Sequence, residues 1–148
     1  MLIFKHNFFI DIRAISATIL RKSWLDRKGY IYYLLTIDKD KYGKIDYNKL
    51  ANELSQELKR YGDLFNDDDY IILLTKYGVY GSYYLPNKIF INIQRDIKDI
   101  VATIIHEIIH LRVEDIVKQK RLNHEEKEEL VEDMLKEFTA KDRQKKEM

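Results

Sequence analysis

The sequence predicts an α+β domain in which a small mixed β-sheet packs against helices. The chain has 148 residues, which is the length of one domain, and we expect a single domain over residues 1–148 with its core in about 2–141. Short β-branched and aromatic runs alternate with helical patterns up to residue 93. Two longer helical patterns then close the chain, and we expect the helices on one side of the sheet.

The first half of the chain is expected to form two strands and two helices. Residues 2–10 are largely apolar and predict a strand, and residues 11–26 carry isoleucines at helical spacing and predict a helix. A β-branched and aromatic run at 30–37 predicts the second strand. Asp46 can cap the second helix, whose expected buried stripe is Leu50, Leu54 and Leu58.

The segment from Asp38 to Asp46 resembles the calcium-binding loop of an EF-hand, with Gly43 at the sixth position. Tyr42 stands where an oxygen ligand is needed, and Lys49 stands where the loop would need a bidentate glutamate. We therefore expect a turn that leads into a capped helix, and no calcium site.

The second half of the chain predicts two further strands and two long helices. The strands are expected at 70–75 and 88–93, with an antiparallel hairpin around Pro86-Asn87. The helical patterns cover 96–119 and 123–141, and each begins with an aspartate or asparagine that can cap it.

The composition excludes several classes of partner. The charges of the 26 basic and 25 acidic residues nearly cancel, so the chain has no overall positive electrostatic potential to attract nucleic acid. The absence of cysteine excludes disulfides and thiolate metal ligands and fits a reducing compartment. Charged residues interrupt the apolar N-terminus, and no apolar run approaches the ~18 residues of a membrane span. We expect a cytoplasmic protein with neither a nucleic-acid nor a membrane partner.

The strongest chemical signal is the segment His106-Glu107-Ile108-Ile109-His110. Residues four apart on a helix differ by about 40° of rotation, so His106 and His110 can offer two imidazole nitrogens to one ion. Glu107 lies about 100° away, where a general base can take a proton from water that the ion activates. The alternative is a pair of buried histidines with satisfied hydrogen bonds, which would leave the coincidence with Glu107 unexplained. The sequence therefore predicts a catalytic zinc site.

Catalytic zinc needs a third protein ligand, and the last predicted helix carries several candidates. Glu129 and Asp133 lie four residues apart and flank an apolar stripe of Leu130, Met134 and Phe138. His124 is an alternative ligand, as in Spartan-like zincins, although it lacks the glycines usual there. The neighbouring carboxylates of this acidic helix face are further candidates for the third ligand: Glu125, Glu126, Glu128 and Glu132.

The HExxH segment, followed nineteen residues after His110 by Glu-x-x-x-Asp, resembles the gluzincins, which are thermolysin-like zincin metallopeptidases. The chain is most similar to the minigluzincins of archaea and their viruses, over roughly residues 70–140. The resemblance implies a zincin fold in which His106, His110 and Glu129 bind Zn²⁺. It also implies that Asp133 accepts the outer ring N–H of a zinc-binding histidine.

The resemblance further implies a strand that aligns the substrate. The segment Gly81–Asn92 is similar to the upper-rim strand of these enzymes, which binds extended peptide by strand addition, and we expect Ile89 and Ile91 to contact substrate. One tyrosine of this region could donate a hydrogen bond to a developing oxyanion; the candidates are Tyr80, Tyr83 and Tyr84.

These features predict a zinc metalloendopeptidase with Glu107 as general base and a peptide or protein as substrate. The resemblance also suggests a latent form of the enzyme. In this form the polar tail at 142–148 turns back, and Glu147 or the terminal carboxylate of Met148 occupies the zinc site. The alternative from another class is a zincin-shaped binding or regulatory module with a structural or vestigial zinc site.

Overall fold

The computed structural model describes residues 1–36, 46–64 and 68–147. Over these residues the chain is a mixture of helices and strands, which confirms the predicted α+β class. The elements in chain order are β1 (Leu2–Lys5), α1 (Phe8–Arg21), α2 (Trp24–Thr36), α3 (Tyr47–Leu58), the 3₁₀ helix η1 (Lys59–Leu64), β2 (Tyr70–Thr75), β3 (Gly81–Tyr84), β4 (Lys88–Asn92), α4 (Ile97–Lys120) and α5 (His124–Glu147). Within these ranges, no helix has the length and apolar character needed to cross a membrane.

The four strands form one mixed sheet in the order β1-β2-β4-β3. β1 and β4 both pair parallel with β2, whereas β3 pairs antiparallel with β4. β3 and β4 are the hairpin predicted around Pro86-Asn87, and Tyr83 lies opposite Ile89 in its register. The sheet of described strands therefore has β3 at an edge and β4 in its interior.

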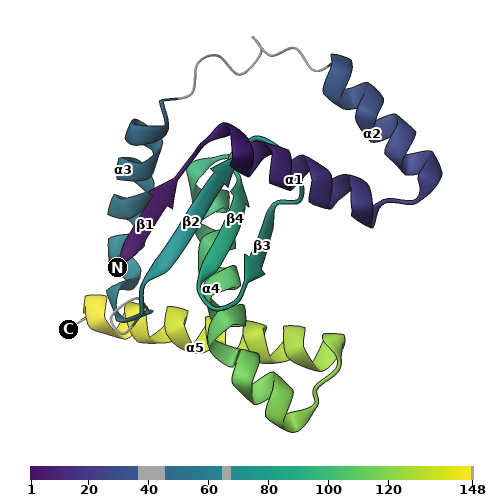
Figure 1. The fold of residues 1–148 in the computed structure, drawn as a ribbon. Helices are drawn as coiled ribbons and strands as arrows, with labels where there is room; N and C mark the ends of the chain where they lie inside the picture. The colour runs from purple at the N-terminus through teal and green to yellow at the C-terminus, as the bar shows by residue number, and fades with distance from the viewer. Residues whose placement is uncertain (37–45, 65–67, 148) are drawn as a thin grey trace.

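Helices cover both faces of the sheet, so the expectation of helices on one side is wrong (Figure 1). Successive strand residues point to opposite faces, which gives two separate cores. The larger core joins the sheet to α3, α4 and α5 and contains Leu54, Leu58, Ile72, Leu74, Ile89, Ile91, Ile100, Ile104, Ile108 and Val131. The smaller core joins the other face to α1 and contains Ile10, Ala14, Leu73 and Phe90.

Two predictions for the N-terminal region are wrong. The first strand ends at Lys5 and not at residue 10, because the Asn7 side chain accepts a hydrogen bond from the Ile10 N–H at 2.9 Å and caps α1. The run expected to be a strand at 30–37 lies, as far as residue 36, in α2. β-branched and aromatic residues favour a strand only where a neighbouring strand can pair with them, and the described sheet offers none there.

The predicted cap of the next helix is confirmed. Asp46 caps α3, since its Oδ1 accepts hydrogen bonds from the backbone N–H groups of Asn48 and Lys49. Residues 37–45, which hold most of the EF-hand-like segment, lie outside the described residues.

α4 and α5 confirm the two long C-terminal helices, but α5 ends later than predicted. It continues to Glu147 and not to about residue 141. At about 1.5 Å per residue, the helix carries Glu147 about 28 Å along its axis from Glu128. As far as Glu147 the chain therefore does not turn back toward α4, as the latent form would require, and Met148 lies outside the described residues.

Candidate metal centre

α4 presents His106 and His110 on one face, as their spacing predicts. The helix is held against the sheet by buried aliphatic side chains along its length: Ile100, Val101, Ile104, Ile105, Ile108, Ile109 and Val113. The His110 ring stacks on Tyr83 of β3, with ring centroids 5.2 Å apart and planes inclined by 12°. The edge strand therefore runs directly beside the motif.

Three side chains able to bind a metal converge at this point from α4 and α5. The Nε2 atoms of His106 and His110 are 2.9 Å apart. Glu128 places Oε2 3.6 Å from Nε2 of His106 and Oε1 3.5 Å from Nε2 of His110. Ligand atoms about 2.0–2.1 Å from a tetrahedral zinc ion are roughly 3.3–3.4 Å from one another. If the two imidazoles moved slightly apart, the three side chains would therefore have the spacing that zinc requires.

The carboxylate that joins the histidines is Glu128 and not the expected Glu129. Glu129 is exposed, and the rival ligand His124 has a side chain that is 82% exposed. The reason is the rotation of α5 about its axis. Val131 is fully buried and marks the face that packs against the core. Glu128, three residues earlier, lies on the same side of the helix, whereas Glu129 lies two residues earlier and on the far side.

Asp133 does not support a histidine as expected. Its side chain is 66% exposed on the outer face of α5, and its Oδ1 lies 3.3 Å from Nζ of Lys136. The Nδ1 atom of His110 is buried and has no hydrogen-bond partner among the described residues. The fold therefore does not bring the expected second carboxylate to the site.

Glu107 is buried beside the histidines. Only 8% of the residue is exposed, and its side chain packs against the backbone of Gly81 in β3. Burial raises the pKa of Glu107 from 4.5 to about 7; the negative charge of Glu128 adds to the rise, and the positive charge of Lys127 opposes it. A carboxylate with this pKa exchanges a proton readily near neutral pH.

Burial has the opposite effect on His110. It lowers the pKa of His110 from 6.5 to about 4, although the charge of Glu128 opposes this change. At neutral pH the ring is therefore uncharged, which is the form that binds a metal.

Tyr83 links the strand edge to both helices of the site. Its hydroxyl donates a hydrogen bond to Oε2 of Glu114 in α4 at 3.0 Å and accepts one from the Lys127 ammonium in α5. The same ammonium lies 4.9 Å from the centroid of the Tyr83 ring. Of the three tyrosines that the sequence singled out, Tyr83 is the one stacked on His110. Lys127 and Glu114 carry no motif that would have identified them.

The expected substrate contacts at Ile89 and Ile91 are wrong. Both side chains are 0% exposed and belong to the larger core, because β4 is an interior strand. Among the described strands, β3 is the one whose edge lies open next to the histidines, and it forms the first part of the segment expected to align the substrate.

Comparisons with models of protein families, with curated proteins and with solved structures found no match to this chain.

Proposed function

We propose that the protein is a zinc-dependent peptide hydrolase. The observation that carries the proposal is the convergence of His106, His110 and Glu128 next to a buried acid, Glu107, and an open strand edge. A pair of structural histidines would need neither the third metal-binding side chain nor a buried carboxyl group with a raised pKa.

His106, His110 and Glu128 are the residues that would hold the ion. Two imidazoles and one carboxylate form a donor set typical of catalytic zinc. When bound, zinc supplies a Lewis acid for a carbonyl oxygen and lowers the pKa of water toward neutrality. Because His110 is uncharged at neutral pH, it does not have to lose a proton before it binds the ion.

Glu107 would act as the general base and then as the general acid. It takes a proton from the attacking water and returns it to the leaving amine. In the metal-free site burial raises its pKa to about 7, which makes it a stronger base there than an ordinary glutamate. The close approach of Gly81 confines the carboxylate, which reduces the freedom lost when it is positioned for reaction.

β3 would bind the substrate as an added strand. The Asn92 N–H donates to the Tyr80 carbonyl at 3.1 Å, which shows that Tyr80 and the alternate residue Ser82 turn their backbone groups toward β4. The backbone groups of Gly81 and Tyr83 then point to the open edge. An extended peptide paired with them would pass beside Glu107 and His110, since these are the side chains that Gly81 and Tyr83 contact.

The experiment is a peptide-library digestion followed by mass spectrometry. The zinc-loaded full chain is expected to cleave unstructured peptides, and Glu107→Gln is expected to lose cleavage but keep zinc, because the amide preserves the shape and cannot accept the proton. Asp115→Asn is the matched control, since it removes an exposed carboxylate from the same helix. Equal cleavage by Glu107→Gln and wild type would contradict the proposal.

A further inference from the structure

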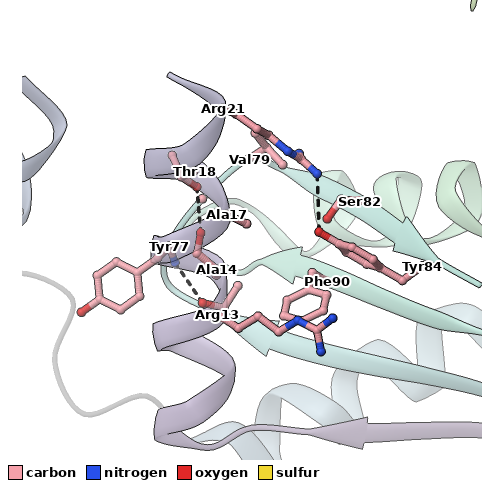
Figure 2. Close-up of a pocket in the computed structure, with 12 residues that line it drawn as sticks. Arg13, Ala14, Ala17, Thr18, Arg21, Tyr77, Val79, Ser82, Tyr84 and Phe90 are labelled. Atoms are coloured by element: carbon pink, nitrogen blue, oxygen red, sulfur yellow. Dashed lines mark hydrogen bonds between the residues drawn. The ribbon is translucent and has the colours of Figure 1, made fainter. Parts of the chain in front are cut away.

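A pocket lies on the face of the sheet opposite the metal ligands, between α1 and the edge strand β3. Figure 2 shows Arg21 reaching from α1 to Tyr84 of β3, and Arg13 lying beside Phe90. The hydroxyl groups of Thr18 and Ser82 also line the pocket. None of these side chains belongs to the group of possible metal ligands.

The pocket is positively charged. Neither Arg13 nor Arg21 forms an ion pair with a described residue, and none of the described residues that line the pocket is acidic. Both guanidinium groups contact aromatic residues. The Arg21 Nη2 donates to the Tyr84 hydroxyl at 3.4 Å, and the Arg13 Cζ lies 5.5 Å from the centroid of the Tyr84 ring and 5.6 Å from that of the Phe90 ring. These contacts leave further N–H donors of both arginines for an anionic group.

The pocket also adjoins the edge at which the substrate would pair. Side chains of β3 alternate between the two faces: Gly81 and Tyr83 contact Glu107 and His110, whereas Ser82 and Tyr84 line the pocket. The side chains of an added strand would alternate in the same way. Every second side chain of the peptide would therefore project on the side of the sheet that carries Arg13 and Arg21.

We propose that this pocket selects peptides with aspartate or glutamate at positions that project toward α1. The proposal rests on the proposed function, because it assumes that peptide pairs with the open edge of β3. A carboxylate that reaches these guanidinium groups gains charge-assisted hydrogen bonds that an amide of the same shape cannot match. The substrate class is thus an extended acidic peptide.

The experiment measures peptide binding without cleavage. The zinc-loaded Glu107→Gln chain is titrated into fluorescent extended peptides that carry aspartate and glutamate, and into copies that carry asparagine and glutamine instead. The acidic peptides are expected to bind more tightly, and Arg21→Gln is expected to reduce that preference by about three- to tenfold, the range between an exposed ion pair and a partly buried one. Lys5→Gln is the control, since it removes an exposed positive charge from β1, at the other edge of the sheet.

Arg21→Gln is preferred to Arg13→Gln because Arg13 packs on two aromatic rings and its loss could disturb the fold. A thermal melt of each variant checks this. Arg21→Glu provides an independent test, since it should shift the preference toward peptides with lysine at the same positions. An acidic preference that survives in both Arg21 variants, or that is absent from the parent chain, would overturn the proposal.

Cleavage assays on the chain that retains Glu107 separate this proposal from the proposed function. Tight, acid-selective binding without cleavage would support the pocket and refute the hydrolase. Cleavage that ignores the charge of the peptide would support the hydrolase and refute the pocket.

Discussion

Gly81→Ala tests whether the position of the general base matters. A Cβ atom at residue 81 would lie 2.6 Å from Oε1 of Glu107 and 2.4 Å from Cγ2 of Thr103. Thr103 is held by its hydroxyl, which donates to the Asp99 carbonyl at 2.8 Å and accepts from Arg95 at 2.6 Å. The added methyl group therefore displaces the Glu107 carboxylate and also presses on the held Thr103 side chain.

The size of the effect follows from these distances. An ordinary contact begins at 3.4 Å, so the carboxylate must shift by about 0.8 Å to accept the methyl group. A misplacement of roughly 1 Å at a reacting group can reduce the rate by ~10²-fold. We expect kcat/KM for peptide hydrolysis to fall by about ten- to a hundredfold. The added group should also lower the free energy of unfolding by about 1–3 kcal/mol, the usual effect of overpacking.

The assay combines peptide hydrolysis, zinc content and thermal unfolding. Zinc content should stay at the wild-type value, because the atoms nearest to a Cβ at residue 81 belong to Thr103 and Glu107 and not to the three metal-binding side chains. Gly29→Ala is the control, since a Cβ there meets nothing within 4 Å. Adding Thr103→Ser to Gly81→Ala should restore part of the activity, because it removes the methyl group that closes the space. Wild-type kcat/KM in Gly81→Ala would refute the role assigned to the Glu107 position.

Two further predictions concern the ligand set and the buried acid. Glu128→Gln should weaken zinc binding, measured by competition with a chelator, by ~100-fold or more, whereas Glu129→Gln should leave it nearly unchanged; the reverse order would return the ligand role to Glu129. In the metal-free protein, Glu107→Gln should raise the free energy of unfolding by up to about 3 kcal/mol above pH 7, because the folded-state pKa of about 7 exceeds the usual 4.5 and the buried charge is unfavourable. This gain should fade as the pH falls from 7 to 4.5, where the carboxyl group is protonated in both states, and a gain that does not change with pH would contradict the burial of Glu107.

The features that the sequence predicts best are those encoded within one element. The position of His106 and His110 on one helical face needs only the periodicity of the helix, and α4 has nearly the predicted bounds. The α3 cap at Asp46 and the β3–β4 hairpin are likewise local, because each depends on residues a few positions apart. These predictions are confirmed.

The errors concern relations between elements. Glu128 and Glu129 differ by one position, so only the rotation of α5 against α4, marked by the burial of Val131, separates them. An apolar stripe that included Val131 and Leu135 as well as Leu130 would have favoured Glu128, since Val131 and Leu135 follow it by three and seven residues. Sequence spacing therefore contained a usable signal.

Other parts of the site carry no such signal. Isoleucines such as Ile89 and Ile91 occur in edge strands and interior strands alike. Only the strand order shows that β4 is internal and that β3 has the open edge. The approach of Gly81 to Glu107 and the stacking of Tyr83 on His110 join residues more than twenty positions apart. Such contacts depend on how the sheet and α4 pack, which periodicity alone does not determine.

The central claim is that one zinc ion is bound by His106, His110 and Glu128. The most direct measurement is a crystal structure of the zinc-loaded chain, with anomalous scattering recorded on both sides of the zinc absorption edge. We predict a single strong peak about 2.0–2.2 Å from the Nε2 atoms of both histidines and from a carboxylate oxygen of Glu128. A peak bound by Glu129 or His124 in place of Glu128, or no peak at the two histidines, would contradict the account.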